Sequence, residues 1–291
     1  MQEAKYYDYK NLRPIDLETD GCDLKDWDRL YGKAVFAKHA KGFRIFLPPH
    51  MMSATNEYAV SDPYTVEQNM AGDFHKRRIN LTIELAQEAI SSMQPVIPRI
   101  LDLGCGQGHI TKELLKKFGS TELSGLDYSL SAIEYAHDHF QGIDFAVGDA
   151  YEAPYSKEYF DLIVCNNLWE HVPDPIRLLT KIDVILKPGG YIIMSTPSRY
   201  HIENLLRILK GKPVTFMSAH HITEYTVGQV IEQFTYGGFQ VERILSRPIS
   251  KGSLEIELAR RFFNIWISLV GSHHKLEETV FYLAKKVVKS A

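Results

Sequence analysis

The chain has 291 residues, a formal net charge of −3 at pH 7, and 45% hydrophobic against 24% charged residues. A chain of this length and balance is typical of a globular enzyme with one sizeable core. The slightly negative charge, without any long basic run, gives no reason to expect a nucleic-acid partner.

The cysteines and the N-terminus indicate a reducing compartment. Cys22, Cys105 and Cys165 are an odd, widely spaced set, unlike the disulfide framework of a small secreted domain. The first residues, MQEAKYYD, lack the apolar centre of a signal peptide. No segment has the roughly 18 uninterrupted apolar residues that a spanning helix needs. We therefore expect a cytoplasmic protein with reduced thiols.

Residues 1–70 carry no motif. They are polar and aromatic, are interrupted by prolines, and contain short apolar runs such as 43–47. A helix is expected from about Phe74 to Ser92, because apolar residues recur there at helical spacing and prolines follow at 95 and 98.

A glycine-rich loop follows the first predicted strand. The segment ILDLGCGQG at 100–108 runs from an apolar strand into Gly104, Gly106 and Gly108, and a helix-like stretch follows at 109–118. Glycines at these positions let the chain turn sharply and let a ligand approach the peptide atoms. The spacing is G-x-G-x-G, whereas the dinucleotide fingerprint is G-x-G-x-x-G. A nicotinamide dehydrogenase is therefore disfavoured.

Four further strands each end in a polar or glycine signal. The segment 122–126 ends in Asp127, about 20 residues after the glycine loop, where an acidic side chain accepts hydrogen bonds from ribose hydroxyls. The segment 143–147 ends before Asp149, whose carboxylate could bind the amine of an adenine. The remaining two are 160–165, which ends in Asn166-Asn167, and 191–195. These groups should meet at the carboxyl edge of a parallel sheet, where such sheets bind ligands.

The motifs, taken together and in order, resemble class I S-adenosylmethionine-dependent methyltransferases. In appearance the chain is similar to the branch that includes the ubiquinone-biosynthesis O-methyltransferases. The motifs are ILDLGCGQG at 100–108, LD at 126–127, GDA at 148–150, FDLIVCNNLWEHVPDP at 160–175 and LKPGG at 186–190. The resemblance covers roughly residues 78–247. It implies a doubly wound α/β fold with a seven-stranded, mostly parallel, Rossmann-like sheet over residues 71–291.

The resemblance also implies the cofactor, S-adenosyl-L-methionine, with S-adenosyl-L-homocysteine as product. Asp102 is expected to anchor the glycine loop and the methionine ammonium, and Asp127 to hold the ribose hydroxyls. Ordinary turns at strand ends would not give five matches in order. Arg77 or Arg78 could reach the methionine carboxylate, or could equally be a solvated charge on a helix. The expected cofactor-binding residues are Asp102, Gly104, Gly106, Asp127, Tyr128, Asp149, Ala150 and Asn166.

Twelve histidines leave the catalytic base open. His171 is the first candidate because it follows the fourth strand, where the methyl group should point, although a histidine there could equally cap backbone. His220 and His221 lie in the segment 197–222, which in this fold often covers the acceptor. Adjacent histidines do not both point inward, so at most one of this pair should act.

The residues around His171 could also form a metal site. In the ubiquinone O-methyltransferases and in small-RNA 2′-O-methyltransferases, a Glu-x-x-Glu-His motif resembles a divalent-metal site, and here the matching residues are Asn167, Glu170 and His171. An amide in the first position lacks the negative charge that a hard cation prefers. Glu170, His171 and a loop histidine could still assemble a weaker site, but we predict no metal.

The C-terminal part raises two interpretations of one helix. A helix at 226–236 and a strand at 239–246 are expected, and 279–286 resembles the family's final antiparallel strand. Between them, 254–270 is apolar and aromatic, with Arg260 and Arg261 beside it. It could be an interfacial membrane helix or partner surface. Packing on the sheet is the preferred interpretation, because aromatic stripes at helical spacing are more often buried.

These expectations lead to a methyltransferase that acts on a small-molecule acceptor, with a hydroxyl oxygen preferred. Transfer to nitrogen or carbon, a lipid-like acceptor, and a non-catalytic S-adenosylmethionine-binding protein remain alternatives, and a homo-oligomer remains open. The segment Asn166-Asn167-Leu168-Trp169 differs from the Asn-Pro-Pro-Tyr/Phe type of many base and amide N-methyltransferases. Residues 1–70 and 197–222 are expected to form a lid that encloses the acceptor and excludes water.

Overall fold

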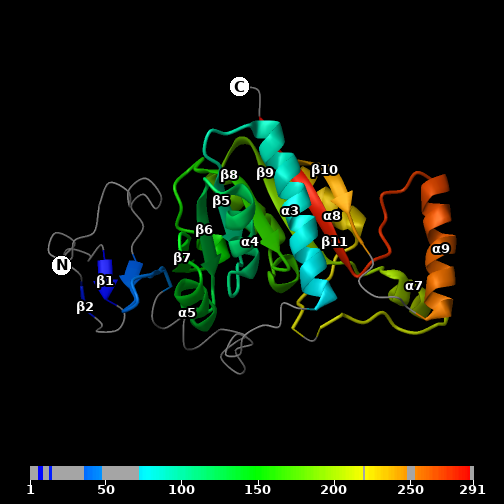
Figure 1. Cartoon of the computed structure of the whole chain (residues 1–291). Coiled ribbons are helices and arrows are strands. Elements are labelled where there is room, and N and C mark those ends of the chain that lie inside the picture. The colour runs from blue at the N-terminus through cyan, green and yellow to red at the C-terminus, as the bar shows by residue number, and fades with distance from the viewer. Residues whose placement is uncertain are drawn as a thin grey trace.

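The computed structural model describes residues 6–8, 13–14, 36–47, 72–218, 220–247 and 253–288. One twisted sheet runs through the described chain, and helices cover both of its faces (Figure 1). Seven of its strands, counted from one edge, have the order β10-β11-β9-β8-β5-β6-β7. They are β5 (Arg99–Leu103), β6 (Glu122–Asp127), β7 (Asp144–Val147), β8 (Phe160–Asn166), β9 (Leu186–Pro197), β10 (Phe239–Leu245) and β11 (Thr279–Lys286).

Among these seven strands the pairing is parallel except at β11, which pairs antiparallel with both β9 and β10. The chain runs outward from β5 through β6 to β7 and then returns to β8 on the other side of β5. This reversal leaves a crevice at the carboxyl ends of β5 and β8, the place where doubly wound sheets bind ligands. The predicted doubly wound α/β fold is confirmed, as is the antiparallel final strand.

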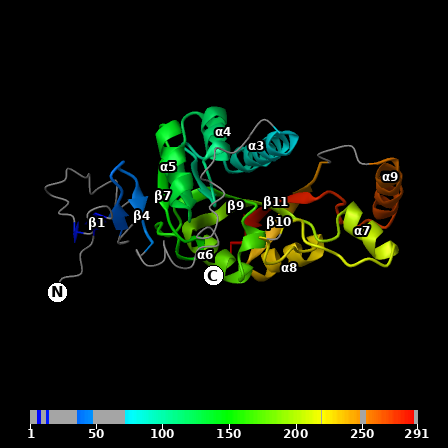
Figure 2. The ribbon, with the colours of Figure 1, turned by 90° about the horizontal axis from the view of Figure 1, so that it is seen from below.

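Helices cover the sheet from both sides (Figure 2). On one face lie α3 (Asp73–Met93), α4 (His109–Phe118) and α5 (Leu130–His139), and on the other lie α6 (Pro175–Ile185) and α8 (Val227–Tyr236). Strand β8 is buried along its whole length because it has helices on both faces. Helix α8 begins at Thr226, which forms a reciprocal capping box with Gln229. Helix α3 is the helix predicted at 74–92, and its bounds are nearly those expected.

The sheet is longer than the seven strands predicted, because part of the N-terminal segment joins it. The added strands are β4 (Arg44–Ile45), β3 (Phe36–Lys38), β1 (Tyr6–Asp8) and β2 (Arg13–Pro14), in that order beyond β7. Strand β4 pairs parallel with β7, and the Phe46 N–H donates to the Val147 carbonyl over 2.8 Å. Phe43, Ile45 and Leu47 are buried against β7 and α5. Their alternation with Arg44 and Phe46 is the two-residue period of a half-buried strand.

This placement bears on the predicted lid. The described residues 36–47 extend one edge of the sheet at β7, at the end of the molecule opposite α9 (Figure 1). Most of residues 1–70, including 15–35 and 48–70, lie outside the described residues, so the lid assigned to this segment stays a prediction.

The helix at 254–270 is not packed on the sheet, and the preferred interpretation was wrong. Helix α9 (Leu254–Leu269) contacts α7 (Ile202–Leu209), and the two lie together beyond the β10–β11 end of the sheet (Figures 1 and 2). No residue of α9 is buried. The reason is topological: the helix is held by another inserted helix rather than by the sheet. Within the described parts of the chain, no helix is both long and apolar enough to cross a membrane.

Candidate active site

The glycine loop joins β5 to α4 at the reversal point of the sheet. Gly104, Gly106 and Gly108 all have positive φ angles, of 76°, 53° and 75°. A Cβ atom on Gly108 would lie 2.8 Å from the Phe145 ring, and one on Gly104 would lie 3.3 Å from Leu168. Both the backbone conformation and the close neighbours therefore require glycine. A cavity of about 190 Å³ opens beside this loop.

Asp102 lies under this cavity and is fully buried at the end of β5. The Thr111 hydroxyl donates to its Oδ2 over 2.6 Å. Burial raises the pKa of Asp102 to about 6, while the Thr111 hydrogen bond and the Arg78 charge oppose the rise and the Asp127 charge adds to it. A buried carboxylate of this kind gains stability when a cation binds beside it. Arg78 lines the same cavity and offers a partner for a carboxylate.

Asp127 ties the end of β6 to the glycine loop. Its Oδ2 accepts a hydrogen bond from the Gly106 N–H over 2.7 Å, and its Oδ1 accepts one from Ser129 N–H over 2.9 Å. Each carboxylate oxygen can accept more than one hydrogen bond, so an incoming hydroxyl can share it. Asp127 therefore holds the loop in shape and could also bind a ribose from the same position. Tyr128, the next residue, is half-buried and packs against the cluster formed by α5, β7 and β4.

Asp149 and Ala150 follow the neighbouring strand, β7. The Asp149 side chain accepts from the Tyr151 N–H over 2.9 Å and caps a short 3₁₀ turn, Ala150–Glu152. The Gly148 N–H donates to the Asp127 carbonyl over 2.9 Å, which fixes the ends of β6 and β7 relative to each other. Asp102, Asp127 and Asp149 thus stand at the carboxyl ends of three adjacent parallel strands, as their spacing predicted.

Asn166 supplies an unsatisfied acceptor to the cavity. Its Nδ2 donates to the Thr82 hydroxyl on α3 over 2.8 Å, which fixes the amide orientation, while its Oδ1 is buried without a hydrogen-bond partner. A buried acceptor left unpaired is costly unless a ligand or water meets it. An amino-acid ammonium would satisfy Asn166 Oδ1 and stabilise the charged form of Asp102. Thr82 and Thr111 had no signal in the sequence that marked them.

The structure brings two of the three predicted histidines together. The rings of His171 and His221 lie 5.2 Å apart, edge to face, and His171 lines the glycine-loop cavity. The His220 side chain is exposed, but its carbonyl oxygen lies 3.2 Å from Nδ1 of His171. A proton on Nδ1 of His171 would be donated to this carbonyl, which makes Nε2 the unprotonated, basic nitrogen of the ring.

Glu224 is a residue that the sequence reasoning missed. Its side chain is fully buried, and its Oε1 lies 2.7 Å from Nδ1 of His221. This pairing holds the His221 ring and makes its Nε2 the basic nitrogen as well. The signal was the i, i+3 spacing of His221 and Glu224 at the end of the 197–222 insertion, next to the predicted histidine.

Glu170, His171 and His221 also form a group whose ligand atoms lie within 4.8 Å of one another. Glu170 is buried, and burial raises the pKa of its carboxyl group. Its two oxygens accept hydrogen bonds from Asn167 Nδ2 and Thr196 Oγ1, each over 3.1 Å. These donors stabilise the carboxylate without a cation. The group has the donor atoms for a metal, but its one carboxylate is already hydrogen-bonded on both oxygens.

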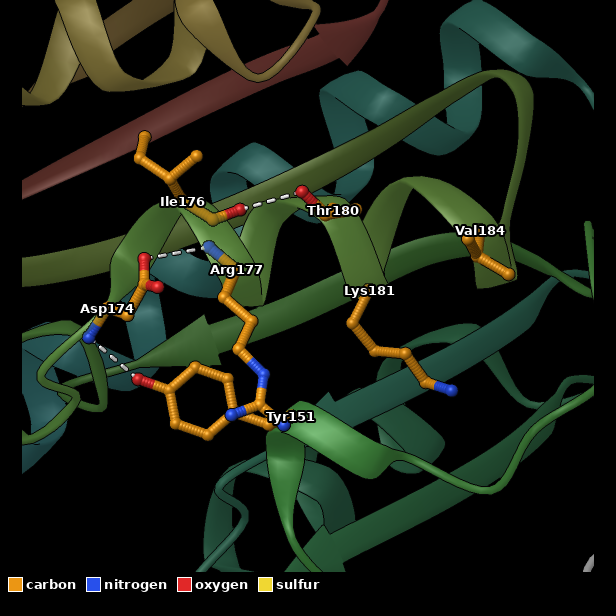
Figure 3. A pocket seen from close by; sticks show the side chains of 7 residues that line it. All are labelled: Tyr151, Asp174, Ile176, Arg177, Thr180, Lys181 and Val184. Atoms are coloured by element: carbon orange, nitrogen blue, oxygen red, sulfur yellow. Dashed lines mark hydrogen bonds between the residues drawn. The ribbon is translucent and has the colours of Figure 1, made fainter.

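A second hollow, of about 460 Å³, lies between α6 and the 150–152 turn and contains none of the predicted site residues. Figure 3 shows Arg177 beside the Tyr151 ring, and the Asp174 N–H donates to the Tyr151 hydroxyl over 2.8 Å. Arg177 stacks over Tyr151 at 4.7 Å and pairs with Glu152. The Arg177 guanidinium is thus already bound to Tyr151 and Glu152 rather than available to a ligand. The glycine-loop cavity is therefore the better candidate site.

Comparison with known proteins agrees with this location. The profile of a family described as "Methyltransferase domain" matches residues 98–245, which includes the glycine loop and every strand from β5 to β10. A ubiquinone biosynthesis O-methyltransferase of Coxiella burnetii is 36% identical over 104 residues, 34% of this chain and 44% of that protein. One of Thiobacillus denitrificans is 34% identical over 117 residues, 38% of this chain and 49% of that protein. The chain spans less than half the length of these curated relatives.

Solved structures share the fold at low sequence identity. One described as a sarcosine dimethylglycine methyltransferase of Galdieria sulphuraria has a TM-score of 0.51 at 17% identity. The superposition covers 78% of this chain and 91% of that structure's chain. The [4+2]-cyclase SpnF has a TM-score of 0.53 at 17% identity, with 76% of this chain and 86% of SpnF covered. The architecture is therefore shared by proteins whose described reactions differ.

Proposed function

The chain belongs to the methyltransferase-domain family, whose cofactor is S-adenosylmethionine, and we propose that it transfers the cofactor's methyl group to a hydroxyl oxygen of a small molecule. The observation that carries the proposal is one cavity. Buried Asp102 and the unpaired Asn166 Oδ1 lie in it, and His171 stands in its wall. Asp102 and Asn166 thus suit the amino-acid end of the cofactor, and His171, the proposed base, lines the same cavity.

The residues present fit S-adenosylmethionine. Asn166 Oδ1 and the Asp102 carboxylate would face the ammonium, and Arg78 the methionine carboxylate. Asp127 would accept from the ribose hydroxyls, while Asp149 and the Ala150 backbone would meet the adenine edge. When bound, the cofactor supplies an electrophilic methyl group on a sulfonium. The chain's own contribution is to align donor and acceptor, which can lower the barrier by several kcal/mol.

His171 is assigned as the base that removes the acceptor proton. If Nδ1 of His171 donates its proton to the His220 carbonyl, Nε2 is unprotonated and can accept a proton. The same hydrogen bond would fix the orientation of the ring. The insertion that carries this carbonyl is tied to the site, because the Ile222 and Thr223 N–H groups donate to the Glu170 carbonyl over 2.9 and 3.3 Å. The 197–222 insertion is therefore proposed as one wall of the acceptor pocket. Cys105 and Cys165 are buried and form no disulfide, which supports the proposal of a cytoplasmic enzyme.

Two alternatives differ in what the acceptor panel would show. The names of the relatives favour oxygen over nitrogen or carbon as the acceptor atom, and a panel of phenols, amines and activated carbon acids separates the three. A non-catalytic S-adenosylmethionine-binding protein would bind the cofactor without turnover on any of them. The fold match to a [4+2]-cyclase shows that the architecture alone does not fix the reaction, so the acceptor panel is needed.

Cofactor binding should depend on pH through Asp102. Its pKa of about 6 in the free protein should fall when an ammonium binds, because the cation favours the ionised form. Affinity for S-adenosylhomocysteine should therefore be nearly constant between about pH 7 and pH 8, where the ligand's ammonium keeps its proton, and fall about tenfold between pH 7.5 and pH 5. Calorimetry at a series of pH values measures this, with NAD as the ligand that should not bind. Asp102→Asn should abolish the dependence, and if the dependence persisted it would belong to the neighbouring histidines instead.

A chelator should leave activity nearly unchanged. Asn167 replaces the carboxylate that a hard cation would need, and both oxygens of Glu170 already accept hydrogen bonds. Turnover is compared before and after dialysis against EDTA, with any metal content measured directly. Loss of turnover on chelation, with recovery in magnesium or zinc, would show that Glu170, His171 and His221 hold a required metal.

A further inference from the structure

Helix α9 presents a continuous apolar face that no described part of the chain covers. The face consists of Leu254, Leu258, Phe262, Ile265, Trp266 and Leu269, whose spacing places them on one side of the helix. Each of these side chains is between 57% and 78% exposed. An exposed stripe of large apolar side chains, with two aromatic rings in it, is unusual on a protein surface and marks an interaction site.

Helix α7 lies beside α9 and ends in an exposed leucine of its own. An ion pair of 2.5 Å between Lys210 and Glu255 joins the end of α7 to the start of α9. Leu209 is the neighbour of Lys210 and is 69% exposed, and Leu254 is the neighbour of Glu255. The two helices therefore form one unit, which lies at the end of the sheet opposite the N-terminal strands (Figure 1).

The residues that flank α7 and α9 give this region a positive charge, unlike the chain as a whole. Residues 199–212 and 253–275 contain seven Lys or Arg and three Glu, in a chain whose net charge is −3. Two of the three glutamates are engaged within the unit, Glu255 with Lys210 and Glu257 with Arg260. Basic side chains beside an aromatic apolar stripe are the pattern of a helix that lies in the interface of an anionic membrane.

A second copy of the chain fits this face less well. A helix of 16 residues is about 24 Å long, so its stripe offers roughly 250 Å², well below the roughly 800 Å² that each partner contributes to a stable dimer. Two such units facing each other would also bring like charges together. We propose that α7 and α9 dock this protein on an anionic lipid bilayer, with α9 lying in the interfacial plane.

The test uses the full chain with vesicles of phosphatidylcholine, alone or mixed with phosphatidylglycerol. Wild-type protein should sediment with the mixed vesicles, less so at high salt, and only weakly with phosphatidylcholine alone. Tryptophan emission should shift to shorter wavelength on binding, and the Trp266→Phe variant separates the contribution of Trp266 from those of Trp27 and buried Trp169. The Trp266→Phe variant should still bind and should lose that shift.

Phe262→Ser with Trp266→Ser should reduce vesicle binding about tenfold or more, because the two aromatic anchors are lost. The matched control is Val96→Ser with Tyr236→Ser, which removes side chains that are 98% and 80% exposed elsewhere. It should bind like wild type, and equal melting temperatures establish that both variants are folded. The proposal is overturned if wild type ignores anionic vesicles or if the α9 variant binds them equally well. A wild-type dimer in sedimentation velocity that this variant dissociates would likewise overturn it, and would assign the face to a second copy.

Discussion

His171→Ala should lower turnover by roughly 10²- to 10⁴-fold on a hydroxyl acceptor while leaving cofactor affinity nearly intact. The reason is that the ring lines the glycine-loop cavity and has the His220 carbonyl beside its Nδ1, which leaves Nε2 as the proposed proton acceptor. Steady-state rates with calorimetric cofactor affinities separate a lost base from a damaged pocket. His171→Gln adds a variant that keeps size and polarity but not basicity.

The chain provides matched controls for this variant. His220→Ala removes an adjacent, exposed imidazole and keeps the carbonyl that faces His171, so turnover should be unchanged. His221→Ala and Glu224→Gln test the neighbouring pair, whose contact is 2.7 Å. If His171→Ala is fully active while His221→Ala and Glu224→Gln are slow, the base is His221, and Glu224 positions it. Full activity in all of these variants would leave no histidine with the role.

Asp127→Ala should weaken binding of S-adenosylhomocysteine by about 1–3 kcal/mol, which is roughly 5- to 150-fold. The ribose hydroxyls would lose a charged acceptor, and the glycine loop would lose the hydrogen bond from Gly106 N–H. Calorimetry measures the affinity. Because the alanine variant changes both contacts, Asp127→Asn is the necessary companion, since it keeps one acceptor oxygen and removes the charge.

The two variants give distinguishable results. If Asp127 binds ribose, both should lose affinity, and adenosine alone should show the same loss because it carries the same two hydroxyls. If Asp127 only shapes the loop, adenosine binding should fall far less than binding of the whole cofactor. Undiminished affinity in Asp127→Ala would remove the ribose assignment altogether.

Local pattern was sufficient to predict the parallel strands and the polar groups at their carboxyl ends. Each strand from β5 to β9 is an apolar run that ends in glycine or a polar side chain, and parallel strands bring their carboxyl ends to one edge. Asp102, Asp127 and Asp149 could therefore be placed together without knowledge of any contact. The same holds for the helix at 227–236, whose start is fixed by the Thr226–Gln229 capping box.

Long-range pairing was not visible in the same way. The alternation of Phe43, Ile45 and Leu47 is short, and only its partner β7, about 100 residues later, makes it a strand. The predicted position of α9 was wrong for a related reason. The sequence of an apolar helix does not show whether it is buried or exposed, and here the helix packs on the inserted helix α7. Thr82 and Thr111 contribute one hydroxyl each to buried site residues, a role that no spacing marks.

Transfer of a labelled methyl group is the most direct test of the proposed function. The wild-type protein is incubated with S-adenosylmethionine labelled on its methyl group and a small-molecule extract, and the products are separated by mass spectrometry. We expect a small molecule that gains the label on oxygen, in step with formation of S-adenosylhomocysteine, and no such product with His171→Ala. Tight cofactor binding with no labelled product, across the extract and the panel of phenols, amines and carbon acids, would contradict the assignment of methyl transfer.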